Sequence, residues 1–183
     1  MVTYSYVGSP ITDPIYRKGT LGRAKEHLEA TVRKLDSRLE QEGIGRAWTC
    51  VPQAMVTQAS SAIPTFSLYV SLLMKVLRER DQTEGLGEQM ARLFVEHLRP
   101  GHVPPVDEEG RIRLDQREMD KDVQAAVERL RHDLNTETLA TLTDFNEYAR
   151  VLQRVFGFAV PGIDYEEPVE IARFVETSHP KSL

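Results

Sequence analysis

The first third of the chain contains two patterns of apolar residues, short continuous runs and a helical period. Residues 2–7 and 46–51 are short apolar runs typical of strands, and the second run ends at Pro52. Between them, apolar side chains recur every three or four residues, the period of a helix with one buried face, at Leu21, Ala24, Leu28, Val32, Leu35 and Leu39. Gly43 is suited to end this helix. The pattern predicts a strand–helix–strand unit with two parallel strands.

The rest of the chain has mainly helical periodicity. The pattern predicts helices over residues 65–80, 83–98 and 145–155. Residues 100–110 form a proline- and acid-rich loop, after which Asp115 and Glu118 make a capping-box-like start for one more helix. The expected fold class is α/β, with two core strands and mostly helices. Two strands alone do not form a stable sheet with helices on both faces. Either further strands come from elsewhere, or this chain has a helix-dominated core.

Composition excludes several classes of function. The net charge of −5 argues against a nucleic-acid or polybasic membrane surface. No basic region followed by an apolar run begins the sequence, and its most apolar window, residues 66–77, is interrupted by Lys75. A single cysteine, Cys50, suits a reducing compartment, so we expect a cytoplasmic protein without a membrane span. No metal site is expected, because the histidines lack zinc-ligand spacing: His27, His97, His102, His132 and His179.

The chemistry that the sequence suggests centres on Tyr16 and Lys25. Lys25 falls within the apolar stripe of the first helix, where an ammonium costs free energy unless it is used or reaches water by snorkelling. On one unbroken helix the two side chains would face opposite ways, since nine residues turn a helix by about 180°. The stretch before the helix is rich in breakers, and Thr20 is a suitable N-cap. We therefore expect Tyr16 to lie outside the helix, with both polar ends facing one cleft.

Three blocks of sequence resemble one enzyme family. They are Tyr-Ser-Tyr-Val-Gly at residues 4–8 with Pro-Ile-Tyr-Arg-Lys-Gly-Thr-Leu-Gly-Arg-Ala-Lys at 14–25, Val-Thr-Gln-Ala-Ser-Ser-Ala-Ile-Pro at 56–64, and the stretch from Phe-Gly-Phe to Gly-Ile-Asp-Tyr at 156–165. Together they resemble the trans-2-enoyl-ACP/CoA reductases, the long single-chain branch related to short-chain dehydrogenases. The resemblance covers nearly the whole chain and corresponds to the C-terminal half of a Rossmann-type reductase. The dinucleotide fingerprint Gly-x-Gly-x-x-Gly does not occur in the sequence, so the N-terminal dinucleotide-binding half is expected to be absent.

The resemblance implies NADH-dependent reduction of trans-2-enoyl thioesters, carried by CoA or by acyl carrier protein, in fatty acid biosynthesis. It implies that Tyr16 hydrogen-bonds the thioester oxygen and donates a proton, while Lys25 holds the nicotinamide ribose and makes the phenol a better acid. Tyr6 corresponds to a substrate-contacting tyrosine, although an edge aromatic that only packs on the first helix fits the sequence equally well. The segment after the second strand corresponds to cofactor contacts through its backbone, at Ala54, Met55 and Val56. The apolar helix over residues 66–77 would line the acyl tunnel or be an ordinary core helix.

Two other interpretations stay open. A carbonyl reductase of the wider short-chain dehydrogenase class would also use a tyrosine and a lysine, but it would usually place them four residues apart on one helix. Alternatively, the chain is a non-catalytic truncated gene product or a helical interaction fragment, which the missing fingerprint favours. We expect the 183 residues alone to bind NADH poorly, because no segment supplies the glycine-rich turn and helix N-terminus that normally hold the pyrophosphate.

Overall fold

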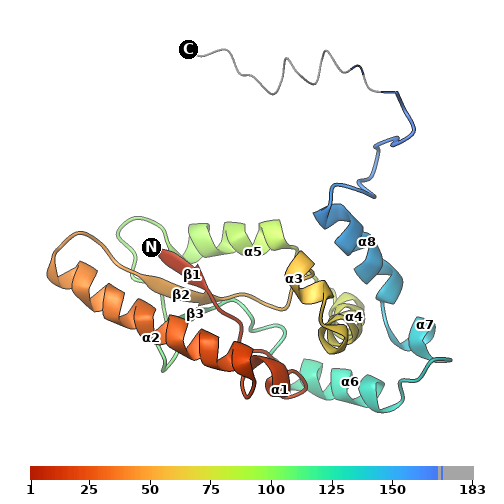
Figure 1. Ribbon diagram of the computed structural model, residues 1–183, viewed down its shortest axis with the longest axis horizontal. Helices are drawn as coiled ribbons and strands as arrows, with labels where there is room; N and C mark the ends of the chain where they lie inside the picture. Colours follow the sequence, from red (N-terminus) through yellow and green to blue (C-terminus); the bar gives the residue numbers. More distant parts are fainter. Residues whose placement is uncertain (169, 171–183) are drawn as a thin grey trace.

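The computed structural model describes residues 1–168 and 170, and its centre is a parallel sheet of three strands. β1 (Val2–Tyr4) pairs with β2 (Trp48–Val51), which pairs with β3 (Arg111–Arg113) in the order β1-β2-β3. Helix α2 (Thr20–Gln41) runs along one face of the sheet and α5 (Leu86–Arg92) along the other (Figure 1). The predicted strand–helix–strand unit with parallel strands is confirmed.

The third strand corrects the prediction of two core strands. β3 contains two arginines around one apolar residue, Ile112, so no apolar run marks it in the sequence. Ile112 and Cys50 are register partners, and both pack against Leu93 and Leu114 in a fully buried cluster on the α5 side. Arg111 is buried because carboxylate groups pair with it, and not because apolar side chains pack around it. A strand stabilised in this way does not show in a hydrophobic pattern.

Most of the helical core lies beyond the sheet. α4 (Pro64–Glu79) packs against α6 (Lys121–His132) and α8 (Phe145–Val155), with three one-turn helices around them: α1 (Asp13–Tyr16), α3 (Gln58–Ser61) and α7 (Leu139–Leu142). The central helix α4 buries most of its apolar side chains, as the core-helix interpretation of residues 66–77 expected. None of the helices in the described residues is long and apolar enough to cross a membrane.

Three helix starts differ from the prediction. Asp115 and Glu118 do not begin a helix, because α6 starts six residues after Asp115 with Asp120 as its N-cap, accepting bonds from the amides of Asp122 and Val123. Both Asp115 and Glu118 are buried and bonded elsewhere. The predicted helix over residues 83–98 begins later, at Leu86, and its last turn widens into a π-helical segment, η1 (Leu93–His97). At the start of α2, Gly19 is the N-cap and Thr20 the first helical residue.

The buried face of α2 is partly polar, which differs from the apolar stripe that the sequence predicts. Leu21 is 42% exposed, whereas Glu29 and Val32 are buried. Glu29 accepts a hydrogen bond from the Ser5 hydroxyl after β1 at 2.6 Å, and its other oxygen lies 3.3 Å from Arg111 in β3. Arg111 also pairs with the carboxylates of Asp107 and Glu109 at 2.9 and 2.6 Å. These charged contacts attach α2 to the sheet and rotate its apolar stripe partly towards solvent.

Replacing Arg111 should therefore destabilise the fold strongly. The side chains of Arg111 and Glu29 are each only 6% exposed, and removing one partner of a buried pair leaves an uncompensated charge. We expect Arg111→Ala to lower the free energy of unfolding by about 3 kcal/mol or more in urea denaturation. The control is Arg38→Ala, which breaks an exposed pair with Glu42 and should cost about 0.5 kcal/mol or less. Similar losses in both variants would contradict a structural role for the buried pair.

Candidate functional site

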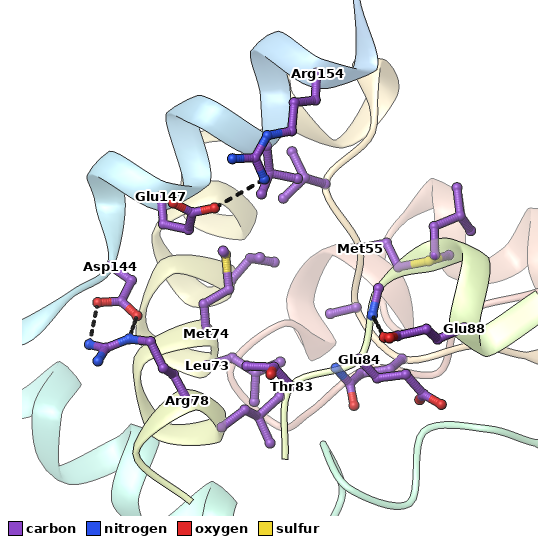
Figure 2. A pocket seen from close by; sticks show the side chains of 18 residues that line it. Met55, Leu73, Met74, Arg78, Thr83, Glu84, Glu88, Asp144, Glu147 and Arg154 are labelled. Atoms are coloured by element: carbon purple, nitrogen blue, oxygen red, sulfur yellow. Dashed lines mark hydrogen bonds and ion pairs between the residues drawn. The ribbon is translucent and has the colours of Figure 1, made fainter. Parts of the chain in front are cut away.

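An apolar cavity opens where the chain leaves β2. It has a volume of about 540 Å³ and lies between the segment after β2, the side of α4, and α8 (Figure 2). Its apolar lining includes Met55, Val56, Val70, Leu73, Met74 and Leu77. Charged side chains at its rim are held in pairs, Arg78 with Asp144 and Arg154 with Glu147 (Figure 2). The cavity thus offers an apolar interior behind a rim at which both arginines are paired with carboxylates, while the Glu88 carboxylate accepts the Gly85 amide.

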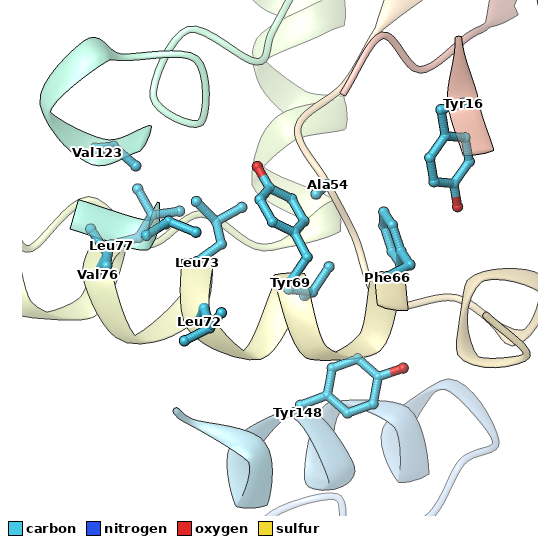
Figure 3. Close-up of a cluster of buried hydrophobic side chains, with 12 residues drawn as sticks. Tyr16, Ala54, Phe66, Tyr69, Leu72, Leu73, Val76, Leu77, Val123 and Tyr148 are labelled. Carbon is cyan, nitrogen blue, oxygen red and sulfur yellow. The ribbon is translucent and has the colours of Figure 1, made fainter. Parts of the chain in front are cut away.

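Tyr16 lies at the end of α1, and the turn at residues 17–19 separates it from α2. The prediction that Tyr16 lies outside the helix containing Lys25 is confirmed. Its ring is buried and meets two other aromatic rings edge-on: Tyr6 at a centroid distance of 4.9 Å and Phe66 at 5.4 Å. Figure 3 shows Tyr16 at the end of the core cluster that follows α4, next to Phe66.

Lys25 lies beside Tyr16, with its Nζ 6.0 Å from the centroid of the tyrosine ring. This is within the range of a cation–π contact. In the described part of the chain, neither the Lys25 ammonium nor the Tyr16 hydroxyl has a hydrogen-bond or ion-pair partner. The hydroxyls of the other five tyrosines are all bonded: Tyr4, Tyr6, Tyr69, Tyr148 and Tyr165. The polar ends of Tyr16 and Lys25 are therefore available to a ligand.

Burial sets the protonation of both groups. It raises the pKa of Tyr16, so the phenol is protonated at neutral pH and can donate a hydrogen bond. The direction is opposite to the acidifying effect of Lys25 that the resemblance implies. Burial also lowers the pKa of Lys25, an effect opposed by the carboxylate of Glu29 one turn further along α2. Tyr16 thus keeps its proton, while the partly desolvated ammonium of Lys25 would be stabilised by an anion or a hydroxyl of a ligand.

A close backbone approach shapes the turn between Tyr16 and Lys25. A Cβ atom on Gly22 would lie 2.1 Å from the Arg17 carbonyl oxygen and 2.8 Å from the Arg17 Cα. Only glycine fits at this point in the first turn of α2. The absence of a side chain at Gly22 therefore sets how closely Tyr16 approaches Lys25.

Tyr6 is next to Tyr16, as the sequence placed it near the site, but its hydroxyl faces inward. It donates a hydrogen bond to Oε1 of the buried Glu118 at 2.7 Å. The Ala54 amide is also used, donating to Oε2 of Glu118 at 2.6 Å. These bonds leave the Tyr6 hydroxyl and the Ala54 N–H committed within the protein. Their roles as substrate and cofactor contacts stay predictions.

The remaining expected cofactor contacts, Met55 and Val56, line the cavity. Tyr16 and Lys25 do not line it, so the expectation that their polar ends face a cleft stays a prediction. Ala54 connects the two regions, because it lines the cavity and also packs in the cluster that contains Tyr16 and Phe66. Within residues 1–168 and 170, no group of histidine, cysteine and acidic residues could hold a metal ion; His179 lies outside them.

Sequence reasoning missed Glu118 as a member of this region. The residue is fully buried and accepts three hydrogen bonds, from Tyr6, Tyr69 and Ala54. In the sequence, the spacing of Asp115 and Glu118 matches that of a helix-capping box, which explains the misinterpretation. No local pattern indicates that a glutamate will meet two tyrosines far away in the chain.

Comparison with known proteins identifies the class. A family model described as "Trans-2-enoyl-CoA reductase catalytic region" matches residues 1–99, and one described as "Enoyl reductase FAD binding domain" matches residues 106–169. The parallel α/β unit carrying the tyrosine–lysine pair thus belongs to the reductases. The chain is a member of the trans-2-enoyl-CoA reductase family.

Individual relatives agree with this assignment. The enoyl-[acyl-carrier-protein] reductase [NADH] of Coxiella burnetii is 48% identical over 174 residues, which cover 95% of this chain and 43% of the relative. The trans-2-enoyl-CoA reductase of Clostridium acetobutulicum, solved with NAD, superposes with a TM-score of 0.90 at 36% identity, covering 98% of this chain and 46% of that chain. The corresponding reductase of Treponema denticola, also solved with NAD, gives a TM-score of 0.84 at 43% identity, over 92% and 42%. The chain spans less than half the length of these relatives.

The stretch matched by the second family model does not fit the phosphates of a flavin dinucleotide. At the N-terminus of α6, the Asp120 side chain already accepts bonds from the amides of Asp122 and Val123. The glycines of the stretch, Gly110, Gly157 and Gly162, stand in open space and line no cradle. We derive no chemical step through a flavin.

Replacement of Gly22 should distort the site through the backbone. We expect Gly22→Ala to lower the free energy of unfolding by about 1–3 kcal/mol, because the new Cβ must push the Arg17 carbonyl away. Gly87→Ala is the matched control, since Gly87 also lies in a helix but has nothing within 4 Å of the added Cβ. That change should stabilise the chain by up to about 1 kcal/mol through helix propensity. Thermal unfolding of both variants measures the difference, and an equal response would contradict the close-approach argument.

Proposed function

We propose that this chain is the C-terminal catalytic and substrate-binding portion of an NADH-dependent enoyl-thioester reductase with a Rossmann-type sheet. Its substrate would be a trans-2-enoyl-CoA or trans-2-enoyl-ACP, and its product the saturated acyl thioester of fatty acid biosynthesis in the cytoplasm. The observation that carries the proposal is the adjacent pair of unbonded polar ends on Tyr16 and Lys25. A protonated phenol beside an ammonium is the arrangement needed to stabilise and protonate a developing enolate.

NADH, when bound, supplies the hydride that reduces the β-carbon of the enoyl group. Tyr16 would hydrogen-bond the thioester oxygen as negative charge develops there and give that oxygen its proton, which leaves a neutral enol and a phenolate. The enol then tautomerises to the saturated thioester by moving a proton to the α-carbon, and the Tyr16 phenolate regains a proton from water. Lys25 would hold the ribose of the nicotinamide nucleotide and add positive charge beside the phenol. The half-buried position of Lys25 supports this role, because a ligand hydroxyl would replace the water that burial removes.

The apolar cavity suits the acyl chain of such a substrate. Met55 and Val56 on one side and Leu73 and Met74 on the other present flexible and branched apolar side chains. An acyl chain gains about 0.8 kcal/mol for each methylene group that it buries. Ala54 would then connect the acyl cavity to the aromatic cluster around Tyr16, with the reacting carbons near that junction.

The alternatives explain less of this geometry. A carbonyl reductase of the short-chain dehydrogenase class would carry both residues on one helix, whereas here a turn separates them. A non-catalytic fragment gives no reason for Tyr16 to be the tyrosine with an unbonded hydroxyl in the described part of the chain. The family membership of residues 1–99 also favours the reductase.

The tyrosine's role can be tested in a hybrid enzyme in which these 183 residues replace the matching part of the Coxiella burnetii reductase. Tyr16→Phe should lower kcat for crotonyl-CoA by about 10²-fold or more, because it removes the proton donor. Binding of NADH should stay close to that of the unmodified hybrid. The measurement is NADH oxidation at saturating substrate, together with a fluorescence titration of the cofactor.

Tyr148→Phe is the matched control, since it removes a buried tyrosine hydroxyl that is bonded to Ser67 at 2.8 Å on the other side of α4. Its kcat should remain near that of the unmodified hybrid. Lys25→Met should weaken both NADH binding and turnover. Crotonyl-CoA reduction at the unmodified rate by Tyr16→Phe would remove the tyrosine from the mechanism.

The 183 residues alone should bind NADH weakly and reduce no enoyl-CoA. The pyrophosphate of a dinucleotide is normally held by a glycine-rich turn and the helix N-terminus after it. Here the glycines near Tyr16 meet local backbone requirements instead. Gly22 leaves room for the Arg17 carbonyl group, and Gly8 has a φ of 75°. Titration of the purified chain with NADH, followed by cofactor fluorescence, measures the affinity. Saturable binding in the low micromolar range with enoyl-CoA-dependent oxidation would contradict this prediction. It would show that the part of the relatives that this chain does not match is not needed for activity.

A further inference from the structure

Glu118 is a fully buried carboxylate at a crossing point of the chain. It follows β3 and accepts hydrogen bonds from the hydroxyls of Tyr6 and Tyr69, both on Oε1, at 2.7 and 2.8 Å. Its Oε2 accepts the Ala54 amide at 2.6 Å. Gln124 of α6 donates to the Glu118 backbone carbonyl at 2.6 Å and so fixes the residue itself. Three other segments of the chain therefore meet at this side chain, and a fourth meets its backbone.

Stability alone gives no reason for this group. Burying a carboxylate is costly, and in the described residues Glu118 has no arginine or lysine partner to offset the cost. Burial raises the pKa of Glu118, and the hydrogen bonds from Ala54, Tyr6 and Tyr69 oppose this rise. What the carboxyl group provides is geometry, because both of its oxygens accept in this structure and the three donors arrive from different segments. Two of these segments, those of Tyr6 and Ala54, are the ones that leave β1 and β2.

The two segments also carry the parts of the proposed site. The Tyr6 ring, held by Glu118, meets the Tyr16 ring edge-on at 4.9 Å. Ala54, held by the other oxygen, begins the segment in which Met55 and Val56 line the cavity. Glu118 therefore fixes the neighbour of the tyrosine and the wall of the acyl cavity with one planar group.

We propose that Glu118 is a positioning residue that sets Tyr16 relative to the acyl cavity, through its bonds to Tyr6 and Ala54. The proposal rests on the proposed reductase function for its effect on turnover. A displacement of about 1 Å between reacting groups can cost about 10²-fold in rate. Tyr69 bonds to the same oxygen from α4, and its ring meets that of Phe66, so it provides an internal comparison.

The test compares Glu118→Gln with Tyr69→Phe in the hybrid enzyme. A glutamine offers one acceptor and one donor where two acceptors are needed, so it must release either the tyrosines or the Ala54 amide. Glu118→Gln should lower kcat by about 10-fold or more, because either release displaces the neighbour of Tyr16 or the wall of the cavity. Tyr69→Phe should lose one buried hydrogen bond yet keep kcat near that of the unmodified hybrid.

A second measurement does not depend on activity. In the 183-residue chain with ¹³C-labelled tyrosines, the ring resonances of Tyr16 report the position of the Tyr6 ring through its ring current. Glu118→Gln should shift these resonances, and Tyr69→Phe should leave them in place. If Glu118→Gln does not fold, Tyr6→Phe replaces it in this measurement, because it cuts the bond to Glu118 from the other end.

Unchanged Tyr16 resonances in Glu118→Gln, or in Tyr6→Phe where that variant is used, would overturn the proposal. So would a kcat in Tyr69→Phe as low as in Glu118→Gln, because a general loss of core stability would then explain both. An inactive unmodified hybrid would instead overturn the proposed reductase function, and the Tyr16 resonances would still decide whether Glu118 positions the tyrosine.

Discussion

The buried pair between Glu29 and Arg111 is the contact on which the arrangement of helix and sheet depends. It joins the middle of α2 to β3, and through the Ser5 hydroxyl it also holds the chain as it leaves β1. Lys25 lies one turn before Glu29 on the same helix, so the pair also fixes the distance of Lys25 from the edge of the sheet where the strands end. A helix held by apolar side chains alone could slide or rotate by a fraction of a turn. A charged anchor in a buried position allows much less of this movement.

Two buried carboxyl groups hold the segments that form the candidate site. Glu29 attaches the helix that carries Lys25, and Glu118 attaches the loop exits that carry Tyr6 and Ala54. Tyr16 lies between these two attachments and contacts both sides, with Tyr6 against its ring and Lys25 beside it. Its own hydroxyl forms no bond in the described residues. Under the proposed function, Tyr16 would thus present its hydroxyl to the substrate between two neighbours held by buried hydrogen bonds, an arrangement that suits transition-state stabilisation.

The sequence predicted the parts that depend on local pattern. The long helix, the two strands beside it and the break between Tyr16 and Lys25 follow from hydrophobic period and from proline and glycine positions. The parts that depend on contacts between distant residues were not predictable. Arg111 of β3 is buried with the local carboxylates of Asp107 and Glu109 and with the distant Glu29 of α2, and Glu118 is buried because two tyrosines and an amide come to it. In both cases the burial of a charged residue depends on at least one distant partner, which no window of neighbouring residues records.

Cys50 lies at the centre of the sheet, paired with Tyr4 on one side and Ile112 on the other, and it has no exposed surface. Burial raises the pKa of its thiol to about 12. At neutral pH the thiol therefore stays protonated, whereas the thiolate is the form that attacks peroxides and disulfides. As the sole cysteine of the sequence, it leaves the chain without a thiol that oxidants can reach while the sheet is intact. Oxidation of a thiol would thus follow the opening of the sheet and report on it.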